Sequence, residues 1–89
     1  MKSRTTERFR KVFEKLSPPI QEQAKETYRL FEQNPSYPSL RFKKIHKSED
    51  TYSVRISQDY GALGVLEGDT IIWFWIGSHA DYDQLINKL

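Results

Sequence analysis

The sequence predicts an α+β fold in which an N-terminal helical hairpin packs on a four-stranded antiparallel sheet and a short helix closes the chain. Three observations support this prediction. Two stretches in the first third repeat apolar residues at helical spacing, and later stretches alternate apolar and polar residues as strands do. An apolar run bounded by turn residues also lies between positions 70 and 77. In a chain of only 89 residues, the other elements must pair with this run or cover it.

Residues 70–77 form the predicted central strand. Six consecutive apolar residues follow a Gly68-Asp69 turn, and such a run is typical of a strand covered on both faces, since a half-exposed strand would alternate. Its β-branched and aromatic residues also favour the pleated surface. Trp73 and Trp75 stand two residues apart, so they are expected to share one face and to fill the core. Stacking on nucleobases is the functional alternative for these rings.

Two helices are predicted before the strands, and residues 1–4 are expected to be frayed or at most a short edge segment. Apolar residues at positions 9, 12, 13 and 16 make one stripe of a helix over about 5–16. Ser17-Pro18-Pro19 ends that helix, because proline breaks the hydrogen-bond ladder but suits the first turn of a new helix. The second helix ends by Asn34-Pro35, and the short connection makes the pair an antiparallel hairpin.

The strands follow from residue 40 onward. Residues 40–46 predict a strand with a bulge near Lys43-Lys44, and 47–50 predict a polar hairpin connection. Residues 51–57 alternate cleanly, which leaves Arg55 on the open side of the sheet, opposite the helices. Residues 60–66 give a third strand, joined to the central strand by a hairpin at 67–69. Ser78 and Asp81 have the spacing of a capping box for a closing helix.

Composition restricts the function classes. One domain over 1–89 is expected, and the chain contains no cysteine, so a disulfide scaffold is excluded and the commonest zinc ligands are missing. No apolar stretch approaches a membrane span or a signal peptide, so we expect a cytoplasmic protein without a membrane partner. His46 and His79 are the only histidines, and their spacing predicts no metal site. His46 is expected at the surface, whereas His79 lies directly after the central strand.

Charge is unevenly distributed although the net charge is only +2. The first half is basic, and the segment 41–47 contains four bases and no acid. The stretch from 58 to the end is acidic. This asymmetry favours contact with a polyanion or with an acidic partner, and solvated surface charge is the structural alternative.

The order of the stretches from the first helix onward resembles the RelE/ParE toxin superfamily. The resemblance rests on residues 38–44, on Tyr52-Ser53-Val54-Arg55-Ile56-Ser57, on 59–64, and on Ile72 to Tyr82 with its Ile-Gly-Ser-His-Ala-Asp-Tyr ending. It covers nearly the whole chain, and the first strand usual in that family is expected to be reduced or missing. The resemblance implies the toxin of a bacterial toxin–antitoxin pair. RelE-like members cleave mRNA in the ribosomal A site without a metal or other cofactor, whereas ParE-like members poison DNA gyrase.

The resemblance also implies roles for individual residues. Arg55 matches the basic residue that contacts the scissile phosphate, while His79 and Tyr82 match the catalytic positions after the last strand. The RNA-binding positions implied are Arg41, Lys43, Lys44 and Ser53. In the implied reaction the 2′-hydroxyl of the RNA attacks the adjacent phosphate, so the protein must stabilise the phosphorane and protonate the leaving oxygen.

One position departs from the family pattern. The third strand commonly carries an active-site arginine where this chain has Gly61, and losing such a charge costs on the order of 10²–10³ in rate. Ser53 likewise replaces a residue that is basic in some ribosome-dependent members. The alternatives to an mRNA endoribonuclease are therefore a ParE-type toxin that is not a nuclease, a degenerate homologue that only binds antitoxin, and a generic nucleic-acid-binding module.

The implied partners are an acidic antitoxin and mRNA on the ribosome. We expect the antitoxin to cover the basic open face at Arg41, Lys43 and Arg55, because opposite charges would meet there. Contact with DNA is expected only indirectly, through the antitoxin.

Overall fold

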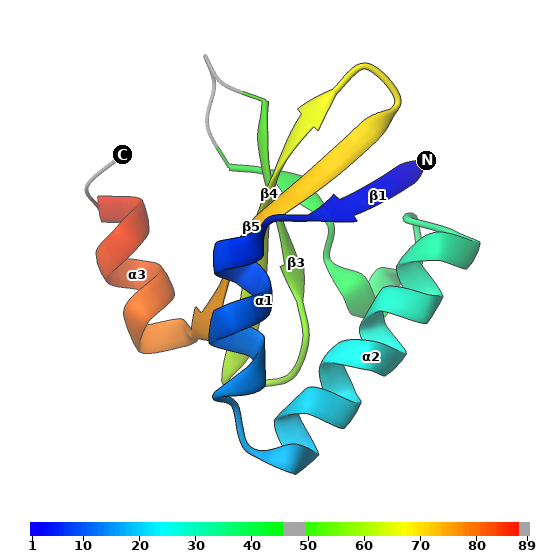
Figure 1. Cartoon of the computed structure of the whole chain (residues 1–89). Coiled ribbons are helices and arrows are strands. Elements are labelled where there is room, and N and C mark those ends of the chain that lie inside the picture. Colours follow the sequence, from blue (N-terminus) through cyan, green and yellow to red (C-terminus); the bar gives the residue numbers. More distant parts are fainter. Residues whose placement is uncertain (46–49, 88–89) are drawn as a thin grey trace.

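The computed structural model describes residues 1–45 and 50–87, and within them one mixed sheet has the strand order β1-β5-β4-β3-β2 (Figure 1). The elements are β1 (Lys2–Thr5), α1 (Glu7–Glu14), α2 (Pro18–Gln33), a 3₁₀ turn η1 (Pro38–Leu40), β2 (Lys43–Lys44), β3 (Thr51–Arg55), β4 (Tyr60–Glu67), β5 (Thr70–Ser78) and α3 (His79–Asn87). The predicted α+β class, the helical hairpin and the closing helix are confirmed. His46 and most of the predicted 47–50 connection lie outside the described residues.

The sheet has one strand more than predicted. Residues 2–5 form β1, which pairs in parallel with β5, while the other neighbouring strands are antiparallel. The family's first strand is therefore short but present. Two backbone hydrogen bonds fix its ends, from Lys2 N–H to the Asp69 carbonyl at 2.9 Å and from Thr6 N–H to the Trp73 carbonyl at 3.0 Å. A polar stretch of four residues has no apolar periodicity that would predict a strand, so β1 could not be predicted from the sequence.

The predicted strand over 40–46 is mostly not a strand. Residues 38–40 form η1, and its Leu40 side chain is 1% exposed and belongs to the core. Arg41 then has a left-handed backbone with φ of 48°, which turns the chain so that only Lys43 and Lys44 pair with β3. Two features explain the difference. Proline, at positions 35 and 38, has no N–H to donate to a strand ladder, and the left-handed backbone of Arg41 turns the chain out of the extended conformation.

The helix ends follow their capping residues. Thr6 accepts a hydrogen bond from the Phe9 N–H at 3.1 Å, so α1 begins at residue 7 rather than 5. Pro18 opens α2 as predicted. Ser78 accepts from the Asp81 N–H at 3.2 Å, which is the first half of the predicted capping box, and it fixes the start of α3.

The core lies between the helices and one face of the sheet. The ring of Phe31 on α2 meets Trp73 on β5 edge to face, with centroids 5.3 Å apart, and both side chains are buried at 2% and 3% exposed. Val54, Ala62 and Ile76 complete this face on β3, β4 and β5. In Figure 1, α1 crosses in front of the sheet and α3 stands beside it. No helix in the described ranges is long and apolar enough to cross a membrane.

A bulge separates the two tryptophans. In the β4–β5 ladder Leu63 pairs with Trp75 while its neighbour Gly64 pairs with Trp73, so Phe74 is an extra residue on β5. The extra residue turns what would be a shared face into two opposite faces. The prediction that Trp73 and Trp75 share one face is therefore wrong. Gly64 has a packing reason here, because a Cβ at this position would come within 2.7 Å of the Trp73 ring.

Candidate nucleic-acid interface on the open face of the sheet

The face of the sheet turned away from α1 and α2 is called the open face here. Side chains directly opposite each other on paired strands share a face. The residues next in sequence to those that face the helices therefore lie on the open face together with their partners on the neighbouring strands. Toward the end of the sheet that carries Arg55, the open face includes Ser53, Arg55, Gly61, Leu63, Trp75 and Gly77. This confirms the predicted placement of Arg55 opposite the helices.

Arg55 is the cation at the end of β3. Its Nε donates to the Ser57 carbonyl at 3.3 Å, which directs the side chain along its own strand. Among the described residues no carboxylate lies within salt-bridge distance of it. The side chain is partly exposed, so most of the donors of its guanidinium are available to a ligand.

Arg55 and two glycines form one rung across the sheet. Arg55 pairs with Gly61, and Gly61 pairs with Gly77. A Cβ built on Gly61 would have only the Val54 carbonyl oxygen within 4 Å, at 3.1 Å, and the glycine itself is buried. Because neighbouring strands are about 4.8 Å apart, the backbones at Arg55 and Gly77 are about 10 Å apart, with only the glycine between them.

His79 and Tyr82 lie at the other end of that rung. The His79 backbone N–H donates to the Asp59 carbonyl at 2.7 Å, which ties the start of α3 to the turn before β4. The two rings lie three residues apart on α3 and meet edge to face, with centroids 5.9 Å apart. Both are partly exposed. The structure therefore brings the predicted residues Arg55, His79 and Tyr82 to the same end of the open face.

Trp75 is a member of this site that the sequence analysis assigned to the core. Its ring lies 6.1 Å from the ring of Tyr82, at a tilt of 49°. It also covers Gly77, where a Cβ would come within 2.7 Å of the indole Cζ2. The bulge at Phe74 is what moves Trp75 to the open face, and an uninterrupted apolar run contains no sign of such a bulge.

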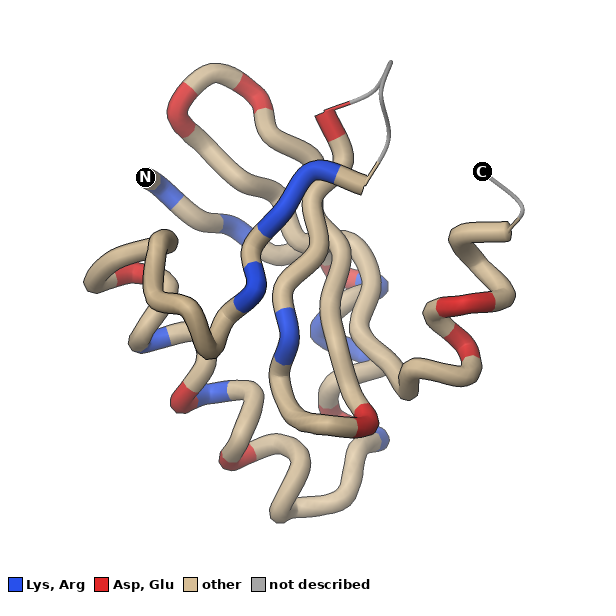
Figure 2. The backbone as a smooth tube through the Cα atoms, turned by 180° about the vertical axis from the view of Figure 1, so that it is seen from behind, with Lys and Arg blue, Asp and Glu red and all other residues tan. Residues whose placement is uncertain are grey.

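The predicted RNA-binding residues are divided between the two faces. Lys43 pairs with Ser53 and so lies on the open face, whereas Lys44 pairs with Tyr52 and points to the helix side. Lys44 also forms an ion pair with Asp50 at 3.4 Å. Arg41 is exposed, but Ser53 is only 6% exposed, so it offers little surface, and its contact with RNA stays a prediction. Figure 2 shows the basic residues along β2 and the acidic residues on α3 at the far margin.

The arrangement suits a phosphodiester ligand. A guanidinium can bind phosphate oxygens, an imidazole can give and take a proton near neutral pH, and aromatic rings can contact bases. Within residues 1–45 and 50–87, no group of three or more His, Cys, Asp and Glu side chains is placed to hold a metal ion.

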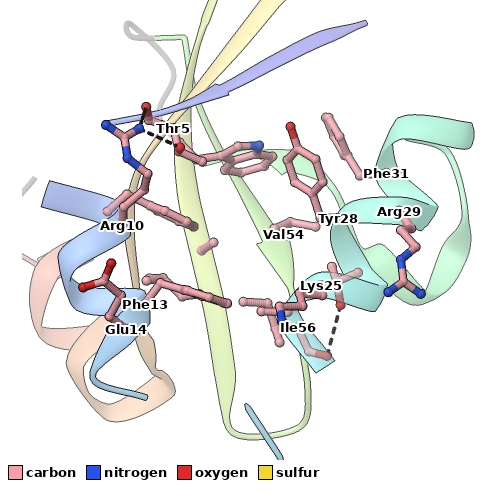
Figure 3. Close-up of a pocket in the computed structure, with 16 residues that line it drawn as sticks. Thr5, Arg10, Phe13, Glu14, Lys25, Tyr28, Arg29, Phe31, Val54 and Ile56 are labelled. Carbon is pink, nitrogen blue, oxygen red and sulfur yellow. Dashed lines mark hydrogen bonds between the residues drawn. The ribbon is translucent and has the colours of Figure 1, made fainter. Parts of the chain in front are cut away.

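A second surface lies on the opposite side of the molecule. A groove of about 650 Å³ opens between α1 and α2 over the helix-side face of the sheet (Figure 3). Phe13, Tyr28 and Phe31 project into it, and charged residues from both helices stand at its margins. None of the predicted site residues lines this groove. Its apolar lining is suited to the apolar side of a protein segment rather than to a nucleic acid.

Comparison with known proteins gives one family and several structures. The sequence profile of the ParE-like toxin domain matches residues 18–84. No curated protein matches the chain. The fold is similar to that of the RelB–RelE antitoxin–toxin complex from Methanococcus jannaschii, with a TM-score of 0.74 and 20% identity over 92% of this chain and 96% of the other.

Two further solved structures have the same fold. The YoeB/ParE toxin from Agrobacterium tumefaciens gives a TM-score of 0.70 and 14% identity, covering 89% of this chain and 99% of the other. YafQ from Escherichia coli gives a TM-score of 0.69 and 15% identity, covering 90% and 94%. At these identities the likeness establishes the fold.

Proposed function

Because the chain belongs to the ParE-like toxin domain family, within the RelE/ParE toxin superfamily, we propose that it is the toxin of a type II toxin–antitoxin system. We further propose that it acts as a metal-independent, ribosome-dependent mRNA endoribonuclease. The observation that supports a nuclease is the grouping of Arg55, His79 and Tyr82 at one end of the open face. Ribosome-bound mRNA as substrate would place its action in the cytoplasm.

The proposed reaction uses the nucleophile of the RNA itself. The 2′-oxygen attacks the adjacent phosphorus and loses its proton to water, and the bond from phosphorus to the 5′-oxygen breaks. The products are a 2′,3′-cyclic phosphate and a 5′-hydroxyl. Arg55 would stabilise the negative charge that develops on the phosphoryl oxygens. His79 would protonate the leaving 5′-oxygen. Tyr82, in contact with the His79 ring, would orient a phosphate oxygen or the base.

Gly61 supports an alternative to the nuclease, because the absence of a side chain there would lower the rate of RNA cleavage. The rung beside Arg55 carries no second cation, since Gly61 and Gly77 have no side chains. Removing one fixed donor from a transition state lowers the reaction rate by on the order of 10²–10³. The alternative is therefore a toxin of the ParE type that does not cleave RNA, or a homologue that only binds antitoxin.

The proposed protein partner is an acidic antitoxin. The open face offers Arg55 and Lys43 without carboxylate partners among the described residues, so an acidic segment that covers them would gain charge-assisted contacts and would block the site. The groove between α1 and α2 offers the same partner an apolar surface. Covering both would bury polar and apolar area together, as stable interfaces do.

Induced expression tests the proposal, with growth and the integrity of ribosome-bound mRNA measured in the same cultures. Growth arrest with cleaved mRNA is the expected result. Arrest with intact mRNA would select the toxin that is not a nuclease. Unchanged growth, in cells that contain the folded protein, would leave only antitoxin binding or general nucleic-acid binding.

A further inference from the structure

The two tryptophans of the chain have contrasting environments. Trp73 is 3% exposed, and its indole N–H donates to the Ser3 hydroxyl at 2.9 Å, so its ring and its polar atom are both used by the fold. Trp75 is partly exposed on the open face. Among the described residues its indole N–H has no hydrogen-bond partner, and it is not a buried atom left without one. A large aromatic ring with accessible surface and a free donor is typical of a binding residue.

The Trp75 ring is also held in place. Gly77 leaves the space that the ring occupies, since any Cβ there would come within 2.7 Å of Cζ2 and 3.0 Å of Cη2. Tyr82 contacts it from α3, with the centroids 6.1 Å apart. A ring fixed by a glycine beneath it and a tyrosine beside it loses little conformational entropy when a ligand stacks on it.

Arg55 and Trp75 lie on either side of Gly61 on the open face. Gly61 pairs with Arg55 on one strand and with Gly77 on the other, and the Trp75 ring covers Gly77. A nucleotide whose phosphate contacts the Arg55 guanidinium would therefore direct its base across this rung, toward the indole.

We propose that Trp75 is a stacking residue for a nucleobase of single-stranded RNA, adjacent to the phosphate held by Arg55. This inference rests on the proposed nuclease function and adds a base contact to the same site. Stacking on an aromatic ring tolerates any base, because every base has a π-face. Trp75 would thus contribute affinity and positioning with little sequence preference. The structural alternative is that its ring only covers Gly77 and supports α3.

Fluorescence tests the inference, because stacking on a base changes indole emission. The probe is a single-stranded heptanucleotide whose 2′-hydroxyls are all methylated, so that it cannot be cleaved, and its binding is followed independently by the anisotropy of an end label. We expect saturating probe to quench wild-type emission and to leave the emission of Trp75→Phe, which retains Trp73, almost unchanged. Trp73→Phe, which retains Trp75, should show the full quench. An abasic oligomer with the same phosphates should bind without quenching.

Affinity and cleavage separate stacking from a structural role. Trp75→Leu should bind the probe on the order of 10- to 100-fold more weakly, and Trp75→Phe should lose less. Both are compared at equal folded fraction, measured by circular dichroism. Equal affinity for Trp75→Leu and wild type, or no quench of Trp75 at saturation, would overturn the stacking role. Cleavage of mRNA on programmed ribosomes is followed in the same variants. If the wild type cleaves mRNA and Trp75→Leu cleaves it equally fast, only the stacking role is overturned. If the wild type does not cleave mRNA, the nuclease proposal itself is overturned.

Discussion

Arg55 lies directly opposite Gly61 in the β3–β4 ladder, so this arginine stands beside backbone that carries no side chain. This pair determines what the open face can do. The guanidinium supplies the charge that a phosphoryl group requires, and the glycine adds no side chain beside it. The same pair also marks where a second cation would stand, and this leads to the first prediction.

Replacing Gly61 tests whether the site lacks only that second charge. We expect Gly61→Arg to raise single-turnover cleavage on programmed ribosomes by at least about tenfold, because a further guanidinium would stabilise the phosphorane. The new Cβ would lie 3.1 Å from the Val54 carbonyl oxygen, so the β3 backbone must shift slightly. Gly61→Ala introduces the same Cβ without the charge and serves as the control. No gain over Gly61→Ala, in a variant that folds and binds ribosomes, would mean that a missing arginine does not limit this site.

Replacing His79 tests the general acid. We expect His79→Gln to slow cleavage by about 10²–10⁴ and to flatten its pH dependence, because the glutamine amide cannot transfer a proton in this range. His79 is held by its backbone bond to Asp59, which the substitution keeps, so the fold should survive. The measurement is the single-turnover rate across pH 5.5–8.5. An unchanged pH profile would exclude His79 as the proton donor.

Replacing Trp73 tests the core. Trp73 is 3% exposed, contacts Phe31, and bonds to Ser3 on β1. We expect Trp73→Ala to lower the free energy of unfolding by roughly 3–5 kcal/mol, measured by urea denaturation. Trp73→Phe keeps most of the ring and should lose much less. A loss below about 1 kcal/mol for Trp73→Ala would contradict the burial of this ring.

The neighbouring lysines of β2 test where the antitoxin binds. Lys43 lies on the open face and Lys44 on the helix side, so Lys43→Glu and Lys44→Glu change the net charge equally at adjacent positions. We expect Lys43→Glu to slow antitoxin association at low salt, because electrostatic steering mainly affects the association rate. Lys44→Glu should slow it less. Wild-type association kinetics for Lys43→Glu at low ionic strength would contradict an antitoxin contact on the open face.

Much of this fold follows from local pattern, because periodic burial leaves a strong signal. The alternation over 51–57 placed Arg55 on the open side correctly, and the apolar run at 70–77 gave β5 almost to the residue. The polar strand β1 had no such signal, since it is fixed by hydrogen bonds to Asp69 and Trp73. The extent of β2 depended on the left-handed backbone of Arg41, which an arginine rarely adopts.

The candidate site could likewise be predicted only where the sequence carries a local pattern or a family resemblance. Arg55, His79 and Tyr82 could be grouped because the resemblance supplied their roles and the alternation supplied their side of the sheet. Trp75 could not, because its face depends on one extra residue at Phe74. In an apolar run every position is a plausible core position, so a shift of register leaves no trace in the sequence.

The most direct test of the account compares wild type with Arg55→Ala on ribosomes programmed with a defined mRNA, under single-turnover conditions. Arg55→Lys keeps the charge without the planar donor fork and serves as the matched variant. The account predicts cleavage by wild type, a loss of on the order of 10²–10³ or more in rate for Arg55→Ala, partial retention for Arg55→Lys, and unchanged thermal unfolding for both. Intact mRNA with ribosome-bound wild-type protein, or equal cleavage by folded Arg55→Ala, would contradict it.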